Sequence, residues 1–276
     1  RAHRRGVRVI QRLDGINWIH RLRPVSLKHT LRAEYGNLNL SLIRRFLTDG
    51  IIYQSDFSKN LWEEKYGRLN IPNKVIHNGV DINTYAPGEG LPANVYRLLV
   101  VEGRLGGGYE SGLSNAIALA EALLDRGWPM EVLVAGVASP NFKAEWQNRS
   151  RVPLRWAGLV KREDIPALDR SAHLLFSADI HPSCPNAVIE ALACGLPVVS
   201  FDTGSLRELV SPDAGFIAPY GGNAWKLEAP DVGGLVAGAE AILKDWKRFS
   251  LAARARAEKL FGLEKMVDDY LEVLLG

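Results

Sequence analysis

Residues 185–201 read PNAVIEALACGLPVVSF, and this stretch contains one helix followed by one strand. Apolar residues recur at helical spacing up to Cys194, and Gly195 and Pro197 then interrupt the helix. The run from Pro197 to Phe201 is short and apolar, as buried strands are. A helix joined directly to a buried strand is the repeating unit of a parallel sheet, so this stretch predicts an α/β fold.

The same unit recurs on both sides of this stretch. We expect further strands at residues 97–102, 130–136, 154–157 and 173–177, and further helices at 110–126, 164–172 and 206–210. Three more helical segments, at 232–246, 248–261 and 263–275, end the chain. This alternation predicts a parallel sheet covered by helices on both faces, and such sheets bind ligands at the carboxyl ends of their strands.

A second, smaller set of elements precedes a segment rich in proline and glycine. We expect strands at 7–10, 50–55 and 74–81, and helices at 28–48 and from a cap at Ser55 or Ser58 to Lys65. The expected domains are residues 1–85, a linker at 86–94, a second domain at 95–255 and a final helical segment at 256–276. Because the chain starts at Arg1 and enters a strand almost at once, we expect the first domain to be truncated.

The composition excludes several classes of protein. The 276 residues are 47% hydrophobic and include two cysteines, Cys184 and Cys194, which cannot supply a disulfide framework for a chain of this length. No apolar run reaches the roughly 18 residues of a membrane helix. The histidines show no metal-ligand spacing. We therefore expect a cytoplasmic protein without a metal centre.

Charge is distributed unevenly along the chain. Residues 1–48 contain eleven lysines and arginines and two acidic residues, a balance of +9, whereas the whole chain has a net charge of +3. Such a block is compatible with a solvated helix face, or with a surface for an anionic acceptor or the inner face of a membrane. A nucleic-acid partner is not expected, because zinc ligands, paired aromatics and a helix-turn-helix pattern are missing. Four of the cations lie on the first expected helix: Lys28, Arg32, Arg44 and Arg45.

Two strand-to-helix loops carry residues suited to binding an anion. The first contains Gly103, Arg104, Gly106, Gly107 and Gly108. Glycine lets backbone amides approach an anion closely, the following helix start is electropositive, and an arginine can contact a phosphate through two hydrogen bonds. The loop matches neither G-x-x-x-x-G-K-[ST] nor G-x-G-x-x-G, so a plain flexible connection remains the alternative.

The second loop leads into the helix that begins at Asn186. We expect Asn186 to cap this helix, which would leave the amides near Ala187 and Val188 free to face a ligand. Glu190 lies one turn further among apolar residues. A carboxylate in such surroundings needs a donor, which is either a ligand hydroxyl or a structural arginine.

Residues 185–210 resemble the donor-site signature of glycosyltransferase family 4, the glycosyl transferases group 1, which are retaining enzymes of the GT-B fold. Four further pieces match in the expected order: NGVD at 78–81, GRL at 103–105, AGLV at 157–160 and the helix-strand unit that ends at Ser177. The resemblance implies two Rossmann-like domains with parallel sheets and a nucleotide-sugar site in the second. It also implies a last helix that returns toward the first domain.

The resemblance assigns roles to the residues that match. Glu190 matches the second glutamate of an E-x7-E motif, which in relatives binds the nucleotide ribose, whereas Pro182 replaces the first glutamate. Arg104 matches the arginine that faces the donor diphosphate, and the lysine that usually follows is missing. Arg104 and Glu190 are therefore the expected catalytic residues. The expected donor-binding residues flank them: Gly103, Gly106, Gly107, Gly108, Leu159, Val160, Ser183, Cys184, Pro185, Asn186, Ala187 and Val188.

On the acceptor side, relatives often carry a His or His-Asp turn at a strand end of the first domain. The comparable turn here has an aspartate and no histidine, and Asp14 and Asn17 are the candidate acceptor-side residues. Glu208 resembles a family glutamate near the sheet edge, and we interpret it as structural.

These residues predict transfer of a sugar from a UDP-, GDP- or ADP-linked donor to a glycan or lipid-linked acceptor with retention, in polysaccharide or glycoconjugate biosynthesis. No cofactor or metal is expected, because relatives stabilise the leaving diphosphate with basic groups and helix amides. Two alternatives remain open. One is a nucleotide-sugar-binding protein weakened in catalysis, which the missing glutamate and lysine would allow, and the other is a GT-B nucleotide-sugar isomerase or hydrolase.

Overall fold

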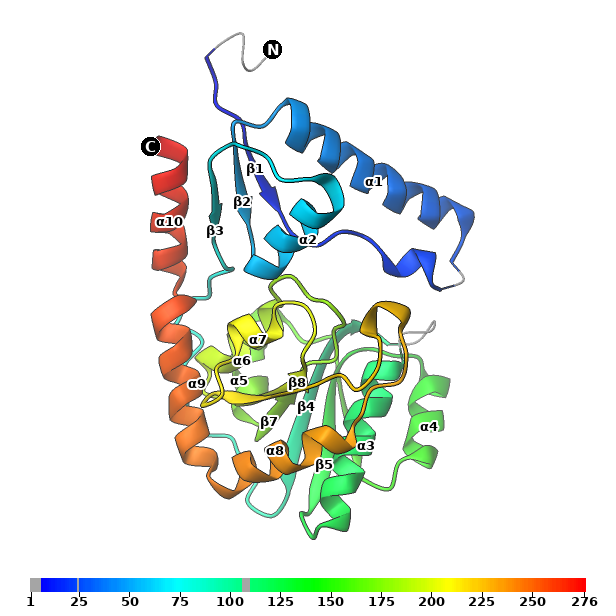
Figure 1. Cartoon of the computed structure of the whole chain (residues 1–276). Coiled ribbons are helices and arrows are strands. Elements are labelled where there is room, and N and C mark those ends of the chain that lie inside the picture. The colour runs from blue at the N-terminus through cyan, green and yellow to red at the C-terminus, as the bar shows by residue number, and fades with distance from the viewer. Residues whose placement is uncertain (1–5, 24, 106–109) are drawn as a thin grey trace.

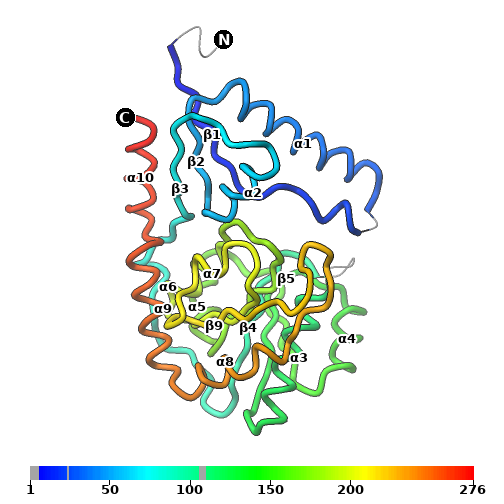
Figure 2. Tube along the Cα trace, in the orientation of Figure 1, coloured from blue at the N-terminus to red at the C-terminus, as the bar shows by residue number. Residues whose placement is uncertain are grey.

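The computed structural model describes residues 6–23, 25–105 and 110–276, and within them it shows two parallel β-sheets (Figure 1 and Figure 2). The first sheet has the order β1-β2-β3, and its strands are β1 (Ile10–Leu13), β2 (Gly50–Tyr53) and β3 (Asn73–Val75). Two helices connect these strands, α1 (Leu27–Phe46) and α2 (Asp56–Tyr66). We refer to these five elements as the first half.

The second sheet has the order β6-β5-β4-β7-β8-β9, with neighbouring strands parallel throughout. Its strands are β4 (Tyr96–Arg104), β5 (Met130–Val137), β6 (Leu154–Gly158), β7 (Leu174–Phe176), β8 (Val198–Phe201) and β9 (Gly215–Ala218). Its helices are α3 (Ser111–Asp125), α4 (Pro140–Arg149), α5 (Ile165–Arg170), α6 (Asn186–Ala193), α7 (Leu206–Leu209), α8 (Gly233–Lys244) and α9 (Trp246–Leu260). We refer to these elements as the second half. Because the strand order reverses between β4 and β7, the carboxyl ends of these two strands mark the place where such sheets bind ligands.

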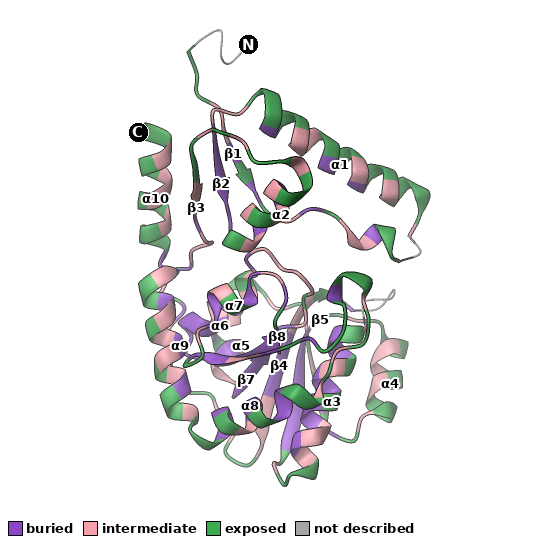
Figure 3. Cartoon of the chain, in the orientation of Figure 1, coloured by how far each residue is buried: buried purple, intermediate pink, exposed green. Residues whose placement is uncertain are grey.

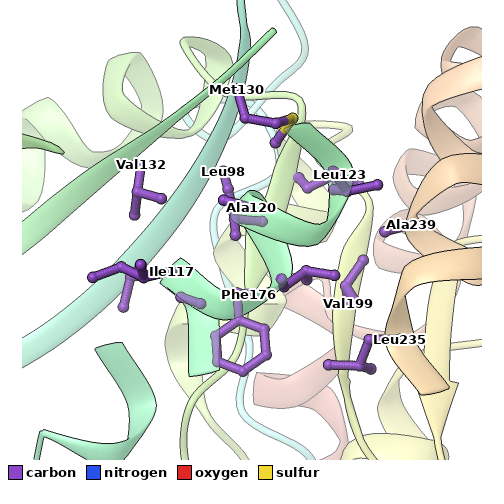
Figure 4. Packing of buried hydrophobic residues seen from close by; sticks show 14 of the residues in the cluster. Leu98, Ile117, Ala120, Leu123, Met130, Val132, Phe176, Val199, Leu235 and Ala239 are labelled. Carbon is purple, nitrogen blue, oxygen red and sulfur yellow. The ribbon is translucent and has the colours of Figure 1, made fainter. Parts of the chain in front are cut away.

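Helices bury both faces of the second sheet, as its continuous apolar strands require. On one face α3 and α8 pack over the sheet, and Leu98, Leu123 and Phe176 lie in the contact with almost no exposed surface (Figure 4). On the other face α6 packs against α9, and Leu192 and Ala253 are fully buried there. Burying one leucine or phenylalanine side chain contributes about 2–3 kcal/mol, so these two layers hold most of the chain's hydrophobic stabilisation.

Two local expectations for the first half have different outcomes. The Ser55 hydroxyl accepts from the amide of Ser58 and the Ser58 hydroxyl accepts from the amide of Ser55, so both expected residues take part in capping α2. The strand expected at 7–10 is displaced, because β1 begins at Ile10, opposite the first residue of β2. The amide of Val9 instead donates to the Asp49 carboxylate at 2.7 Å.

Two elements of the second half were not expected from the sequence. Helix α4 has no fully buried residue, and only Phe142 and Trp146, four residues apart, pack against the core, although Ser139 caps the helix and Pro140 opens it. Strand β9 has only four residues, and a glycine starts it. A Cβ on Gly215 would overlap the carbonyl oxygen of Val198 in β8, so glycine is needed for this close pairing.

The last helix, α10 (Leu263–Leu275), leaves the second half and lies along β3 of the first half (Figure 1). The Lys74 ammonium bridges the carboxylates of Asp269 and Glu272 at 2.8 Å each, and Arg12 donates to the Tyr270 hydroxyl at 2.7 Å. The expected limit between residues 255 and 256 falls inside α9, and the other domain limits stay predictions.

The chain crosses between the halves twice, and the two crossings lie side by side. The amide of Val80 donates to the carbonyl of Phe261 at 2.8 Å, and the amide of Leu263 donates back to the carbonyl of Val80 at 2.9 Å. A Cβ on Gly79 would come 3.0 Å from Leu263 Cα, so this glycine allows the start of α10 to approach. The halves are therefore joined by a short, hydrogen-bonded double connection.

Helix α1 has a full row of exposed apolar residues, and α10 also exposes Leu263, Val267, Leu271 and Leu274. The exposed positions of both helices are green in Figure 3. Arg44, which the sequence analysis grouped with the surface cations, is 2% exposed and donates to the Gly67 carbonyl at 2.9 Å, so it is not available to an anionic partner. Among the described helices none is long and apolar enough to cross a bilayer. We call the exposed row the α1 stripe: Leu27, Leu31, Tyr35, Leu38, Leu42 and Phe46.

Candidate functional site

The acceptor-side turn of the first half faces the loop that precedes α6 in the second half. A Cβ on Gly15 would come 2.8 Å from the Ser183 hydroxyl oxygen, and the rings of Trp18 and His181 lie 5.4 Å apart. Both segments follow the carboxyl end of a parallel strand, β1 and β7 respectively. The structure thus brings the predicted acceptor and donor segments together in space.

Asn78, the first residue of the NGVD motif, holds the loop before α6. Its side-chain amide donates to the Cys184 carbonyl at 3.0 Å and to Asn186 Oδ1 at 2.8 Å, and its backbone amide donates to Cys184 Sγ at 3.3 Å. Its own oxygen accepts from Arg12 at 2.6 Å. Burial raises the pKa of the Cys184 thiol to about 11, and the Asn78 amide offsets only part of that rise. Cys184 is therefore a neutral thiol that fixes the loop.

The start of α6 differs from the expectation in one respect. Pro185 occupies the cap position with φ −69° and ψ 120°, and Asn186 is the first helical residue, with its side chain engaged by Asn78. The prediction that Asn186 caps the helix is wrong, because proline already has the backbone torsion that this position needs. Val188 is fully buried and its amide donates to the Pro185 carbonyl at 3.2 Å, so it does not supply the free amide expected of it. Ala187 lies half-buried between them.

Glu190 lies half-buried one turn into α6. Burial raises the pKa of its carboxyl, while the charge of Arg162 and the hydroxyl of Tyr85 offset part of the rise. Arg162 forms no ion pair with Glu190 among the described residues. A structural arginine therefore stabilises this carboxylate only through its charge at longer range, and not through direct contact. Glu190 keeps hydrogen-bonding capacity that ribose hydroxyls can use.

The other donor-side residues lie at the carboxyl ends of β4 and β6. Arg104 ends β4 opposite Val137, is exposed, and makes no ion pair within the described residues. Gly103 beside it is also exposed, and 77% of Leu159 is exposed, with Val160 half-buried behind it. An exposed arginine at this edge can reach a diphosphate without first breaking an internal contact. Gly106, Gly107 and Gly108 lie outside the described residues.

The acceptor-side residues Asp14 and Asn17 lie just beyond β1. Asp14 is exposed, and its carbonyl accepts from the Trp62 indole at 2.7 Å. Asn17 is tied to Asn37 of α1 by three bonds. Its backbone amide and its side-chain amide donate to Asn37 Oδ1 at 3.0 and 3.4 Å, and Asn37 Nδ2 donates to its carbonyl at 2.8 Å. The Asp14 carboxylate therefore remains the group of this turn that can meet a ligand.

Glu208 connects the two halves. Its carboxylate accepts from the amides of Asp56 and Phe57 at the start of α2, at 2.9 and 3.3 Å, and lies 2.7 Å from His77 Nε2. Burial alone would raise the pKa of Glu208, but the hydrogen bonds from His77 and the two amides hold it below its ordinary value. A negative charge at a helix start is favourable. These contacts support the structural interpretation of Glu208.

Two carboxylates at the reversal point of the second sheet were missed from the sequence. Glu102 and Asp179 follow the apolar parts of β4 and β7, which pair with each other. Burial and the negative charge of Asp179 raise the pKa of Glu102 to about 7, and burial raises the pKa of Asp179. The sequence signal that could have identified these two residues is an acidic residue near the end of an apolar strand. They do not form a metal site with others, since the described residues contain no group of three or more His, Cys, Asp and Glu side chains able to hold an ion.

An aromatic cluster beside the acceptor-side turn was also missed. It contains Trp18 and Phe57 from the first half and His181 and Trp225 from the second, with the His181 and Trp225 rings stacked at 3.7 Å. Burial lowers the pKa of His181 to about 4, and neither ring nitrogen has a hydrogen-bond partner among the described residues. No sequence pattern links these four residues, since they are brought together only by the meeting of the halves.

Comparison with protein families and curated proteins points to one group. A family model described as glycosyl transferases group 1 matches residues 97–245, more than half of the chain. The chain is 26% identical over 181 residues to the GDP-mannose-dependent alpha-(1-6)-phosphatidylinositol dimannoside mannosyltransferase of Mycobacterium tuberculosis, a match that covers 62% of this chain and 45% of that protein. It is 28% identical over 221 residues to the lipopolysaccharide core biosynthesis mannosyltransferase LpsB of Rhizobium meliloti, covering 71% and 59%. The chain thus spans about half the length of these relatives.

Comparison with solved structures concerns the fold. Sucrose-phosphate synthase from Thermosynechococcus elongatus superimposes with a TM-score of 0.75 at 17% identity, covering 97% of this chain and 67% of that one. Anabaena Alr3699/HepE in complex with UDP-glucose superimposes with a TM-score of 0.69 at 19% identity, covering 98% and 72%. At these identities the likeness shows the fold alone, and it confirms the expected GT-B type with two parallel sheets.

Proposed function

The chain belongs to the glycosyl transferases group 1 family, and on this premise we propose that it is a retaining enzyme of glycosyltransferase family 4. In this proposal it moves a sugar from a nucleotide diphosphate sugar to a glycan or lipid-linked acceptor in polysaccharide or glycoconjugate biosynthesis. The observation that carries the proposal is the placement of Arg104 and Glu190 around the carboxyl edge of the second sheet, in the order of the family motifs.

The chemistry follows from charge that develops on the leaving diphosphate. As the bond between the sugar and the diphosphate breaks, negative charge grows on the diphosphate oxygens, and an exposed Arg104 and the electropositive start of α6 stabilise it. Glu190 holds the ribose hydroxyls and so fixes the nucleotide. In this mechanism neither a metal nor a cofactor is required, because the chain's own positive groups carry the electrostatic role.

Two of the similar proteins are associated by name with a nucleotide sugar. The Mycobacterium tuberculosis protein is GDP-mannose-dependent, and the Anabaena structure contains UDP-glucose. We therefore place GDP-mannose and UDP-glucose first in the donor panel, with ADP-glucose as the third carrier. In this proposal the backbone groups of Leu159 and Val160 contact the nucleotide base, and they can accommodate uracil, guanine or adenine.

The test is a thermal-shift and calorimetry panel with these three nucleotide sugars and their free nucleotides. Glu190→Ala should weaken nucleotide binding about tenfold, equal to about 1.4 kcal/mol, while Glu145→Ala, which removes an exposed carboxylate of α4, should leave it unchanged. Equal affinity in wild type and Glu190→Ala would remove Glu190 from the site. Binding without turnover would favour the catalytically weakened binding protein, and turnover without an acceptor would favour the isomerase or hydrolase.

We also propose a peripheral membrane contact through α1, at the cytoplasmic face. The α1 stripe gives one side of this 20-residue helix an apolar surface, and exposed Lys28, Arg32 and Arg45 lie on the same helix. Apolar insertion combined with cations is how helices bind anionic bilayers. Such a contact would hold the protein near a lipid-linked acceptor.

Sedimentation with lipid vesicles tests the membrane contact. The chain should bind vesicles that contain phosphatidylglycerol, and salt or pure phosphatidylcholine should weaken binding. Replacing both Leu31 and Leu38 by serine should abolish it without unfolding the chain. Equal partition of wild type and variant would contradict the proposal, and so would a stable dimer that uses the α1 stripe as its interface.

A further inference from the structure

A pocket lined by both apolar and polar groups lies at the reversal point of the second sheet, on the side covered by α3. It has two parts of about 280 and 130 Å³, which share Arg23, Ser111, Asp179 and Leu227 in their walls. The walls come from the carboxyl ends of β4, β7, β8 and β9, from the first turn of α3 and from Ile19 and Arg23 of the first half. Arg104, Leu159 and Glu190 do not line either part. The pocket is therefore separate from these three predicted nucleotide contacts, whereas Gly106, Gly107 and Gly108 lie outside the described residues.

The groups that line the pocket suit a sugar ring better than an anion or an apolar ligand. Glu102 and Asp179 supply carboxylates, Ser111 a hydroxyl and Asn115 a side-chain amide. The rings and aliphatic side chains of β7 and β8 supply an apolar wall, which includes Phe176. A sugar presents vicinal hydroxyls at its edge and C–H groups on its face, so it satisfies both kinds of wall. Glu102 and Asp179 disfavour a phosphate beside them, although Arg23 also lines both parts.

The backbone is arranged to direct Glu102 into this pocket. The pairing of β4 with β5 shifts by one residue between Val101 and Arg104, a bulge of the kind that redirects a side chain next to an active site. The partner residue Gly136 has φ +149°, and a Cβ there would overlap the Glu102 carbonyl oxygen. Only glycine therefore fits in β5 opposite the bulge of β4.

A second glycine permits the start of α3 to close over the same carboxylate. A Cβ on Gly112 would come 2.5 Å from the Cβ of Ala178 and 3.4 Å from Glu102 Oε1. The first turn of α3 therefore packs directly on the end of β7 and beside the Glu102 side chain. The bulge, Gly136 and Gly112 together fix the position of the Glu102 carboxylate. A carboxylate on the solvated surface would not need such constraints on the backbone.

We propose that this pocket is an acceptor subsite that binds one monosaccharide ring through hydrogen bonds from its hydroxyls to Glu102 and Asp179. The inference rests on the proposed glycosyl transfer. The acceptor is assigned rather than the donor because Ile19 and Arg23 follow the acceptor-side turn directly in the chain and line the pocket. Asp179 lines both parts and Glu102 lines the smaller part. The two parts, about 280 and 130 Å³, together lie near the lower end of the roughly 300–1,000 Å³ of sites for drug-sized ligands, which fits one ring rather than a nucleotide.

The chemistry of the two carboxylates supports binding of neutral hydroxyls near neutral pH. Because burial and mutual repulsion raise the pKa of Glu102 to about 7, its carboxyl is protonated for part of the time. A protonated carboxyl donates one hydrogen bond and a carboxylate accepts several. Together the two groups can donate to one sugar hydroxyl and accept from its neighbour.

The test is binding of methyl α-mannoside and methyl α-glucoside to the 276-residue chain, measured by saturation-transfer NMR. At least one glycoside should bind, and Glu102→Gln and Asp179→Asn should each raise its Kd about tenfold. Glu145→Gln, the matched change at an exposed carboxylate of α4, should leave the Kd unchanged. The inference is overturned if wild type binds neither glycoside, or if both pocket variants bind as wild type does.

Competition experiments separate the acceptor from the donor sugar. Glycoside binding should persist when GDP-mannose or UDP-glucose is added, and displacement by a nucleotide sugar but not by the free nucleotide would overturn the acceptor assignment. Nucleotide affinity, measured by calorimetry, should be the same in wild type, Glu102→Gln and Asp179→Asn. If no nucleotide binds wild type but a glycoside binds through Glu102, the proposed function and the acceptor role fail, while monosaccharide binding in this pocket stands.

Discussion

The two halves of the chain use the same construction, parallel strands joined by helices, but they differ in how completely their apolar residues are buried. Leu98 in β4 has no exposed surface, whereas Leu31 on α1 is 62% exposed. The second half carries Arg104 and Glu190, and the first contributes Asp14 and the walls formed by Ile19 and Arg23. The difference teaches that an apolar helical pattern predicts the helix but not whether another element covers it.

Truncating one leucine in each half gives the largest contrast. Leu98→Ala should lower the free energy of unfolding by about 3–4 kcal/mol, because it leaves a cavity between α3 and the sheet. Leu31→Ala should change it by less than about 0.5 kcal/mol, because the side chain is already in water. Urea unfolding of both variants measures the difference. A large loss for Leu31→Ala would show that a second copy covers the α1 stripe, which light scattering would detect.

The buried acid of the second half should make stability depend on pH. Glu102 has an ordinary pKa of 4.5 and a folded pKa of about 7, so the folded chain binds this proton more tightly than the unfolded chain does. Its contribution is complete below about pH 4.5 and is lost as the pH rises through about 7, with a loss of up to about 3 kcal/mol. Glu102→Gln should therefore flatten the profile of unfolding free energy between about pH 5 and about pH 8. Parallel profiles for wild type and variant would contradict the folded pKa.

The exposed arginine of the second half should matter for turnover and not for stability. Arg104→Ala should lower kcat about a hundredfold, which is about 3 kcal/mol of transition-state stabilisation, because it removes a positive charge from the leaving diphosphate. The melting temperature should not change, since the side chain has no ion pair within the described part of the chain. Arg104→Lys should recover part of the rate, and an unchanged rate in Arg104→Ala would remove this residue from the site.

The contact between the halves should have a smaller effect. Glu208→Gln keeps the size of the side chain but removes the charge that faces His77 and the start of α2, and we expect a loss of about 1–2 kcal/mol. Thermal unfolding measures the loss. Glu163→Gln, an exposed carboxylate near the end of β6, is the control, and equal melting temperatures for the two variants would show that Glu208 does not join the halves.

Most strands and helices of the second half could be predicted because burial imposes a pattern on their residues. The run 197–201 and the periodic helix at 186–194 are visible without structural knowledge. Helix α4 was missed because only two of its residues, Phe142 and Trp146, pack against the core, which is too short an apolar pattern to predict a helix. Strand β1 was displaced because its register depends on where β2 begins. Packing in three dimensions decides both features.

The site could be predicted only where a family motif names a residue. Arg104 and Glu190 follow from such motifs, but Glu102 and Asp179 become neighbours only because β4 pairs with β7, a strand far away in the chain. Asn186 was expected to cap α6 because asparagine is a good cap, and Pro185 occupies that position instead. The structural roles of these residues depend on the order of the strands in the sheet and on the backbone torsions of neighbouring residues. Neither can be predicted from residue type alone.

The paired crossings at Val80 and Phe261 limit how the halves can move. Two segments of the chain are hydrogen-bonded side by side at one edge, so the halves can rotate about a single axis but resist sliding past each other. Sliding would break both the bond from Val80 to Phe261 and the bond from Leu263 to Val80. The aromatic cluster of Trp18, Phe57, His181 and Trp225 joins the halves elsewhere and would separate on rotation. Substrate entry and product release would then require rotation of one half relative to the other about this axis. The contacts that hold the halves closed, rather than those at the axis, would set the rate of that rotation.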